Sequence, residues 1–108
     1  MEAFESADLV AGSSGDRVAY EEFLRVPALS MGIYRIPAGA EDPQSPHAQD
    51  EVYVVASGRA VLTVQGERRT VGPGAIVFVA ANAEHRFEEV TEDLATLVFF
   101  APAETEAG

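Results

Sequence analysis

Short apolar runs, each about the length of one strand, follow one another along the chain with turn residues between them. In the first run, Val18, Tyr20, Leu24 and Val26 share one parity. Such runs at intervals of about 8 to 12 residues are typical of β-sandwiches and barrels. We therefore expect strands in eight ranges: 18–26, 29–36, 51–56, 60–65, 68–71, 75–79, 85–90 and 94–100.

Turn signals separate these runs. We expect turns at 57–58, at 65–67, at 72–74 and at 91–93, since each holds glycine, proline or short polar residues. Only Phe4–Val10 offers an alternative, a short helix or an edge strand. With no helix long enough to cover a face, the pattern predicts an all-β fold, a small closed barrel or jelly roll. Such barrels bind ligands in their mouths or interiors.

The 108 residues form one domain on this interpretation. Residues 1–16 are expected to be an N-terminal segment that is either flexible or exchanged as a strand between two copies. Residues 17–102 form the barrel. Residues 103–108 are an acidic tail that we expect to be frayed.

The charge and composition of the chain exclude several classes of partner and of site. The formal net charge is −11, and all seven basic residues are Arg. This charge repels nucleic acids and anionic membrane surfaces, so we expect neither as a partner. The absence of Cys excludes disulfides, thiolate metal sites and a cysteine nucleophile. The first residues carry no secretory signal and no apolar run is long enough to span a membrane, so we expect a cytoplasmic protein that takes cationic or neutral ligands.

The chain has two histidines, His47 and His85, and each lies at the edge of a predicted strand. Glu51 follows His47 by four residues, about 13 Å in a straight strand, so the two can share an ion only if the chain bends between them. Two imidazoles and a carboxylate would make a mixed nitrogen and oxygen site with open coordination positions. The alternatives are an exposed loop histidine, a histidine paired with a nearby acid, and a glutamate that guards a strand against aggregation.

The spacing of these residues resembles the two motifs of a small single-domain cupin. In the first motif, Gly39, His47, Glu51 and Gly58 stand at the family's intervals, and Ser45 stands where its first histidine would be. In the second, Gly74 and His85 match. Ala80, Asn82 and Glu89 replace the family's proline, glycine and asparagine.

The resemblance implies a double-stranded β-helix in which His47, Glu51 and His85 hold a divalent metal, Fe, Mn, Ni or Zn. It also implies a homodimer, which residues 1–26 would form by exchanging or adding a strand. Family activities favour a dioxygenase-like oxidoreductase acting on an enol, phenol or carbonyl compound, with Glu51 moving a proton. The alternatives are an isomerase, cyclase or lyase, a non-catalytic module that senses a metal or small ligand, and a cupin without metal.

Other polar and aromatic residues lie near these three in the sequence. A fourth ligand or an outer hydrogen-bonding partner could come from Gln44, Ser45 or Gln49. Tyr53 and Phe87 follow Glu51 and His85 by two residues and so share their faces, either as pocket walls or as ordinary packing. Tyr34 and Arg35 have opposite parity, so only one faces inward, where a phenol or an anion-binding guanidinium would line the pocket.

Overall fold

The computed structural model describes residues 1–12 and 15–105, and its described elements are antiparallel strands and one short helix. The strands are β1 (Ala19–Val26), β2 (Leu29–Ile36), β3 (Asp50–Val64), β4 (Glu67–Val71), β5 (Ile76–Val79) and β6 (His85–Ala101). The helix α1 (Ser6–Ala11) precedes them. The sequence left open whether Phe4–Val10 forms a short helix or an edge strand, and the structure has a helix there. Residues 13–14 of the predicted N-terminal segment lie outside the described residues.

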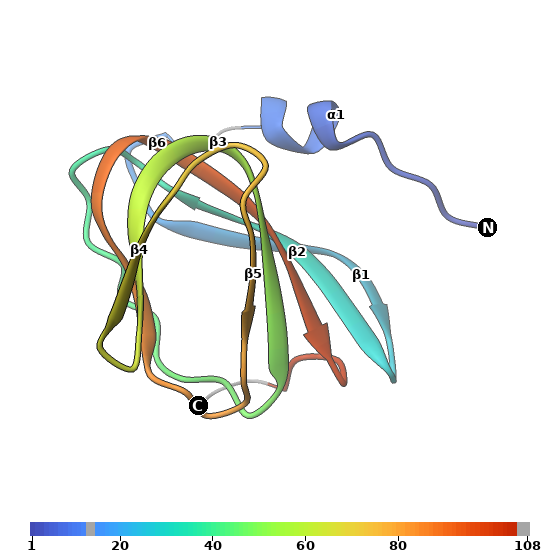
Figure 1. Cartoon of the computed structure of the whole chain (residues 1–108). Coiled ribbons are helices and arrows are strands. Elements are labelled where there is room, and N and C mark those ends of the chain that lie inside the picture. The colour runs from blue at the N-terminus through green and yellow to red at the C-terminus, as the bar shows by residue number, and fades with distance from the viewer. Residues whose placement is uncertain (13–14, 106–108) are drawn as a thin grey trace.

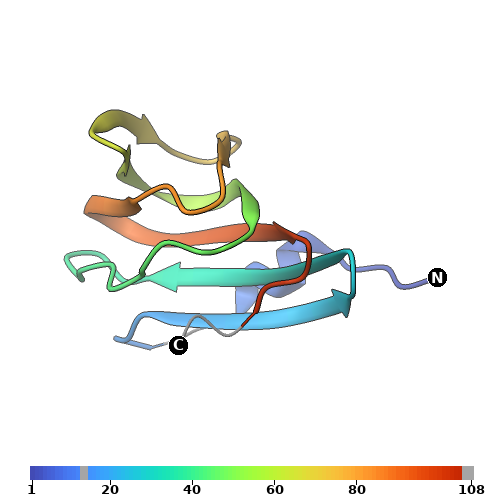
Figure 2. The same ribbon diagram turned by 90° about the horizontal axis from the view of Figure 1, so that it is seen from below.

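The strands form a single sheet that curls over on itself (Figure 1). Its order is β1-β2-β6-β3-β4, with β5 beside β3. The first part of β6 pairs with the end of β3, and its last part lies between β2 and the start of β3. Figure 2 shows β1, β2, β6 and β3 one above another as the wall of the barrel. The protein is thus an all-β double-stranded β-helix, as the pattern and the resemblance predicted.

Two long strands replace four of the predicted eight, because the turns predicted at 57–58 and 91–93 are wrong. At both places the chain bends and continues in the sheet, with register shifts on β3 between Val55 and Val61. Gly58 has a φ of 90°, and a Cβ there would lie 2.2 Å from the Asp93 carbonyl oxygen. Glycine therefore lets β3 and β6 cross in close contact at this corner, so that it marks a bulge rather than a turn.

The predicted hairpin at 65–67 is confirmed. Gln65 and Gly66 alone connect β3 to β4, with φ values of 47° and 84°. Two positive φ values are characteristic of the tight turn whose twist matches a two-residue hairpin.

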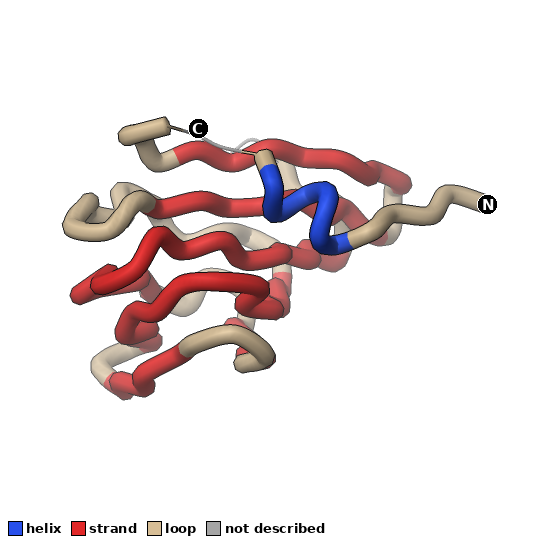
Figure 3. The backbone as a smooth tube through the Cα atoms, turned by 90° about the horizontal axis from the view of Figure 1, so that it is seen from above, coloured by secondary structure: helices blue, strands red, loops and turns tan. Residues whose placement is uncertain are grey.

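Helix α1 lies across the outside of the strand layer (Figure 3). Arg35 of β2 holds it there by donating a hydrogen bond to the Leu9 carbonyl oxygen in its last turn. In the described parts of the chain, 1–12 and 15–105, no helix has the length and apolar character needed to cross a membrane.

The expected fraying of the tail is wrong for residues 103–105. Ala103 is buried, and its N–H donates to the Pro27 carbonyl oxygen at 3.2 Å. The N–H of Glu104 donates to Ser30 Oγ at 2.8 Å. The chain after β6 is therefore held beside the start of β2. Residues 106–108 lie outside the described residues.

Candidate metal centre

The three predicted ligands, His47, Glu51 and His85, meet inside the barrel. One potential ligand atom from each lies within 4.8 Å of the others. Glu51 lies at the start of β3 and His85 at the start of β6, and the pleat of each strand points the side chain inward. His47 lies in the loop before β3, which begins only at Asp50, so the chain does not run straight from His47 to Glu51. The Asn82 N–H holds this bend by donating to the His47 carbonyl oxygen at 2.7 Å.

His85 is oriented by hydrogen bonds on both of its ring nitrogens. Its Nδ1 donates to the Ala83 carbonyl oxygen at 2.8 Å, which leaves Nε2 directed into the site, 2.7 Å from Glu51 Oε1. Burial alone lowers the pKa of His85. The hydrogen bonds to Glu51 and Ala83 outweigh burial, and the pKa of His85 is raised above its usual value. Without a metal, the raised pKa therefore favours a proton on Nε2, the atom that would face a cation.

Glu51 is buried with part of its hydrogen-bonding capacity unused. It is 2% exposed, and its Oε2 has no hydrogen-bond partner among the described residues. A buried carboxylate is costly unless a cation or donors compensate its charge. His47 Nδ1 lies 2.9 Å from Glu104 Oε2, at ion-pair distance but outside hydrogen-bond geometry. Two imidazoles and an incompletely paired carboxylate therefore fit a divalent metal.

A second buried carboxylate, Asp42, was not singled out from the sequence. It accepts hydrogen bonds from the Tyr34 hydroxyl at 2.5 Å, from the Phe87 N–H at 2.8 Å and from both amides of Gln44, at 3.1 Å to the backbone N–H and 2.5 Å to Nε2. Burial, and then the hydrogen bond to Asp42, raises the pKa of Tyr34, so its phenol stays protonated. Asp42 thus joins the loop to β2 and β6. No pattern in the sequence pointed to this role, because loop residues follow no hydrophobic period.

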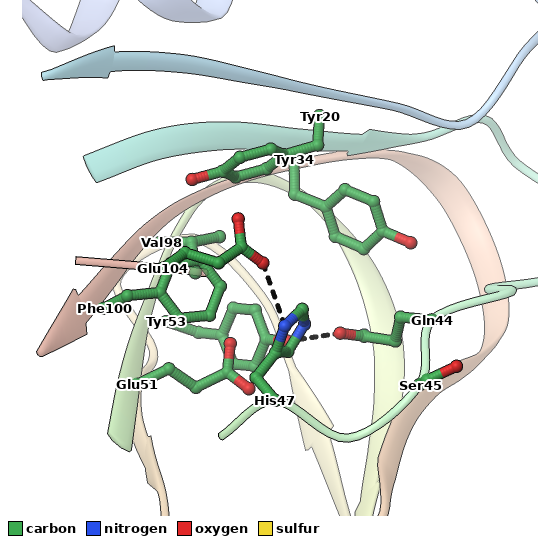
Figure 4. A pocket seen from close by; sticks show the side chains of 10 residues that line it. All are labelled: Tyr20, Tyr34, Gln44, Ser45, His47, Glu51, Tyr53, Val98, Phe100 and Glu104. Atoms are coloured by element: carbon green, nitrogen blue, oxygen red, sulfur yellow. Dashed lines mark hydrogen bonds and ion pairs between the residues drawn. The ribbon is translucent and has the colours of Figure 1, made fainter. Parts of the chain in front are cut away.

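A cavity of about 300 Å³ opens onto the site. Figure 4 shows the aromatic rings of Tyr20, Tyr34 and Phe100 on the side facing His47 and Glu51. No Arg is among the described residues that line it. The residues that line it are Tyr20, Tyr34, Gln44, Ser45, His47, Glu51, Tyr53, Val98, Phe100 and Glu104.

Four of these lining residues, Tyr20, Val98, Phe100 and Glu104, were not selected from the sequence. The strand period could have selected Val98 and Phe100, because they share a parity and both side chains are buried. No strand period includes Glu104, because it lies in a short acidic segment that is typical of a solvent-exposed tail.

Two of the four candidate pocket walls, Arg35 and Phe87, do not line the cavity. Arg35 faces the opposite side of β2 from Tyr34 and contacts α1, so the inward residue of this pair is Tyr34. Phe87 does face inward, but it packs behind Tyr53, with ring centroids 4.9 Å apart, and does not line the cavity. Tyr53 itself lines the cavity as predicted.

The three candidates for a fourth ligand are placed differently. The carbonyl oxygen of the Gln44 side chain lies 3.1 Å from His85 Nε2. Ser45 lines the cavity, but its hydroxyl is turned away from His47 (Figure 4). Gln49 is buried outside the cavity lining, and its Nε2 donates to Thr105 Oγ1 at 2.8 Å.

Comparison with known proteins agrees with this architecture. A family model described as a cupin domain matches residues 32–101. The chain therefore belongs to the cupin family. It is 46% identical over 105 residues to an uncharacterized protein of Streptomyces coelicolor, a match that covers 97% of this chain and 100% of that protein.

Two solved structures are also similar. The protein TT1209 of Thermus thermophilus superposes with a TM-score of 0.80 at 25% identity, covering 95% of this chain and 99% of that one. The DMSP lyase DddQ of Ruegeria pomeroyi superposes with a TM-score of 0.74, also at 25% identity. That match covers 80% of this chain and 47% of the lyase, so the chain spans about half the length of the lyase.

Proposed function

We propose that this cupin is a metal-dependent enzyme that acts on a small organic molecule bound in the 300 Å³ cavity. The observation that carries the proposal is the convergence of His47, Glu51 and His85 at a cavity of this size. Its volume is at the lower end of the range for small-molecule sites, about 300 to 1,000 Å³. Bound there, a divalent metal would supply a Lewis acid with coordination positions left open for substrate or oxygen.

The chain's own residues would perform the remaining tasks. Glu51 Oε2, which has no hydrogen-bond partner among the described residues, can accept a proton from the substrate. The rings of Tyr20, Tyr34 and Phe100 would exclude water and pack against an apolar part of the substrate. Because no Arg lines the cavity, a substrate with several negative charges is disfavoured.

The first test is metal content. Protein purified without an affinity tag should carry near-stoichiometric metal, and His47→Ala, His85→Ala and Glu51→Gln should each lose most of it. Glu67→Gln, the same acid-to-amide change on exposed β4, is the matched control and should retain the metal. Wild-type protein that stays metal-free after reconstitution with Fe, Mn, Ni and Zn would refute the proposal.

The reaction we place first is dioxygenase-like oxidation of an enol, phenol or carbonyl compound. The aromatic walls and the open metal positions support it. Metal-loaded protein should consume oxygen with a flavonol, a diketone or a catechol, and Glu51→Gln should abolish this consumption. A flat oxygen-electrode trace across the panel would rule out this chemistry for these substrates.

A second reaction, metal-assisted elimination, is favoured by Tyr53. Its hydroxyl lies 3.1 Å from His85 Nε2, and burial followed by the nearby Glu51 charge raises its pKa, so it stays protonated. It can donate a hydrogen bond to the substrate oxygen on which charge develops, while Glu51 takes the proton and the leaving group departs with the electron pair of its bond. Similarity to a DMSP lyase points the same way and makes DMSP the first probe. Turnover that proceeds without oxygen and is lost in Tyr53→Phe, with metal retained, would establish this reaction over the first.

A further inference from the structure

The site holds a carbonyl oxygen that the family motif does not supply. The family's first histidine is absent, because Ser45 occupies that position and turns its hydroxyl away from His47 (Figure 4). The preceding residue, Gln44, instead directs its side-chain Oε1 inward. This oxygen lies 3.1 Å from His85 Nε2 and accepts a hydrogen bond from the Tyr53 hydroxyl at 3.0 Å.

Asp42 determines which end of the Gln44 amide faces the site. An ionised carboxylate can only accept hydrogen bonds, so the amide end that touches it must be the NH₂ group. Gln44 Nε2 contacts Asp42 Oδ2 at 2.5 Å, while the Gln44 backbone N–H donates to Asp42 Oδ1 at 3.1 Å. The carbonyl oxygen must then point the other way, toward His85. Asp42 is itself fixed by the Tyr34 hydroxyl and the Phe87 N–H.

The distance between Gln44 Oε1 and His85 Nε2 matches that of neighbouring positions around one ion. Two ligands at about 2.1 Å from a metal and at right angles to each other lie about 3 Å apart. The 3.1 Å between Gln44 Oε1 and His85 Nε2 agrees with this separation. Amide oxygen is an established donor for divalent cations, and here it adds no charge to a site that already holds Glu51.

We propose that Gln44 Oε1 is the fourth protein ligand of the metal, in place of the family's first histidine, and that Asp42 is the positioning residue that orients it. The inference rests on the proposed metal centre of His47, Glu51 and His85. It gives that centre two nitrogen and two oxygen donors and a net protein charge of −1 from Glu51.

The composition of the chain allows a direct test, because side-chain amides are few. The sequence contains three glutamines, Gln44, Gln49 and Gln65, and one asparagine, Asn82. A proton–nitrogen correlation spectrum of uniformly labelled protein therefore shows four side-chain NH₂ groups. On titration with Zn²⁺, the Gln44 NH₂ signal should shift several times more than that of Gln65, which lies on the exposed hairpin. The imidazole nitrogens should shift at the same time.

Affinity gives the second readout. Gln44→Leu should weaken Zn²⁺ binding by about 10- to 100-fold, the range seen when a supporting ligand interaction is removed. Gln49→Leu is the matched control, because it makes the same change at a buried glutamine that is bonded to Thr105, and it should leave the affinity within about twofold. Gln44→His should recover the wild-type affinity or exceed it.

The role of Asp42 is tested through Gln44. Asp42→Asn should reduce both the zinc affinity and the zinc-induced shift of the Gln44 NH₂ signal. In the Gln44→Leu background the same change should have no further effect on zinc affinity. An equal loss in both backgrounds would show that Asp42 supports the fold rather than Gln44.

The outcomes separate the inference from the proposed function. If the imidazole nitrogens respond to Zn²⁺ while the Gln44 NH₂ signal does not, the metal centre stands and the fourth ligand is refuted. If neither responds, the proposed function itself fails. The wild-type spectrum decides between these results even if a variant does not fold.

Discussion

Among single residues, His85 shows most clearly how the site compensates a buried charge. With Glu51 on one side and the Ala83 carbonyl oxygen on the other, both of its ring nitrogens have an acceptor within 2.8 Å. Only the protonated ring can donate to both. In the metal-free site the raised pKa of His85 therefore favours a proton at Nε2, where a metal would bind.

This pairing predicts opposite pH dependences for the two forms. The raised pKa of folded His85 stabilises the metal-free fold fully below the usual value of about 6.5, and this stabilisation is lost as pH rises through the folded pKa. Urea unfolding of chelator-treated protein should therefore show a lower midpoint at about pH 9 than at about pH 6. His85→Asn should remove most of this difference.

Metal-loaded protein should show the reverse trend, because the metal competes with the proton for Nε2. If the metal-free midpoint rises between the two pH values in wild-type protein, the proposed pairing of His85 with Glu51 is wrong.

Gly32 of β2 places one wall of the cavity. A Cβ at this position would lie 2.3 Å from the end of the Tyr20 ring, so the ring can lie over β2 only because the side chain is absent. We expect Gly32→Ala to push the ring outward and to cost about 1 kcal/mol, the low end for overpacking, because Tyr20 lies at the rim. In a Tyr20→Ala background the same change should cost almost nothing. Equal costs in both backgrounds, measured by urea unfolding, would contradict this contact.

At the scale of elements, the segment after β6 acts as part of the site. Glu104 reaches His47 Nδ1 from residues 103–105, which are anchored to Pro27 and Ser30. Carboxylates that contact metal-binding histidines fix the ring and increase its basicity. Glu104→Gln should therefore lower zinc affinity by about 10-fold while leaving the unfolding midpoint of metal-free protein nearly unchanged. Glu92→Gln, on the exposed part of β6, is the control. An unchanged affinity in Glu104→Gln would separate Glu104 from the metal centre.

The elements also show what the sequence could predict. The direction of Glu51, Tyr53 and His85 followed from a two-residue period, because a strand with one buried face fixes every side chain along it. The roles of Asp42 and Glu104 could not be predicted in this way, because a loop and a terminal segment are positioned by contacts with strands far away in the sequence. The corner at Gly58 was misread as a turn because glycine marks both a turn and a bulge.

For the whole molecule, the fold class was predictable because short apolar runs with regular breaks leave few alternatives to a barrel. The number of strands was not predictable, because a strand that bends at a bulge continues in the sheet instead of ending there. The net charge limited the classes of partner but did not locate the site. Its three candidate ligands come from separate elements and were matched to one another only by the family spacing.

Homodimer formation stays a prediction for the whole molecule. Ile76 and Phe78 of β5 are 71% and 61% exposed and alternate with the inward Val77 and Val79. They offer an apolar surface besides residues 1–26. Light scattering at micromolar concentration should give the mass of two chains, and the double variant Ile76→Glu/Phe78→Glu should give one if β5 is the contact. Arg69→Glu on exposed β4 is the control. A single-chain mass for the wild type would contradict the prediction.

Gln44 has one more consequence beyond its contacts with Asp42 and Tyr53. Its side chain borders both the cavity at the metal centre and a second cavity of about 220 Å³, lined in part by His85 and Arg86. Gln44 is thus a residue that the two cavities share. We expect Gln44→Ala to enlarge both cavities at the wall they share, so that the pocket at the candidate metal centre would admit longer molecules.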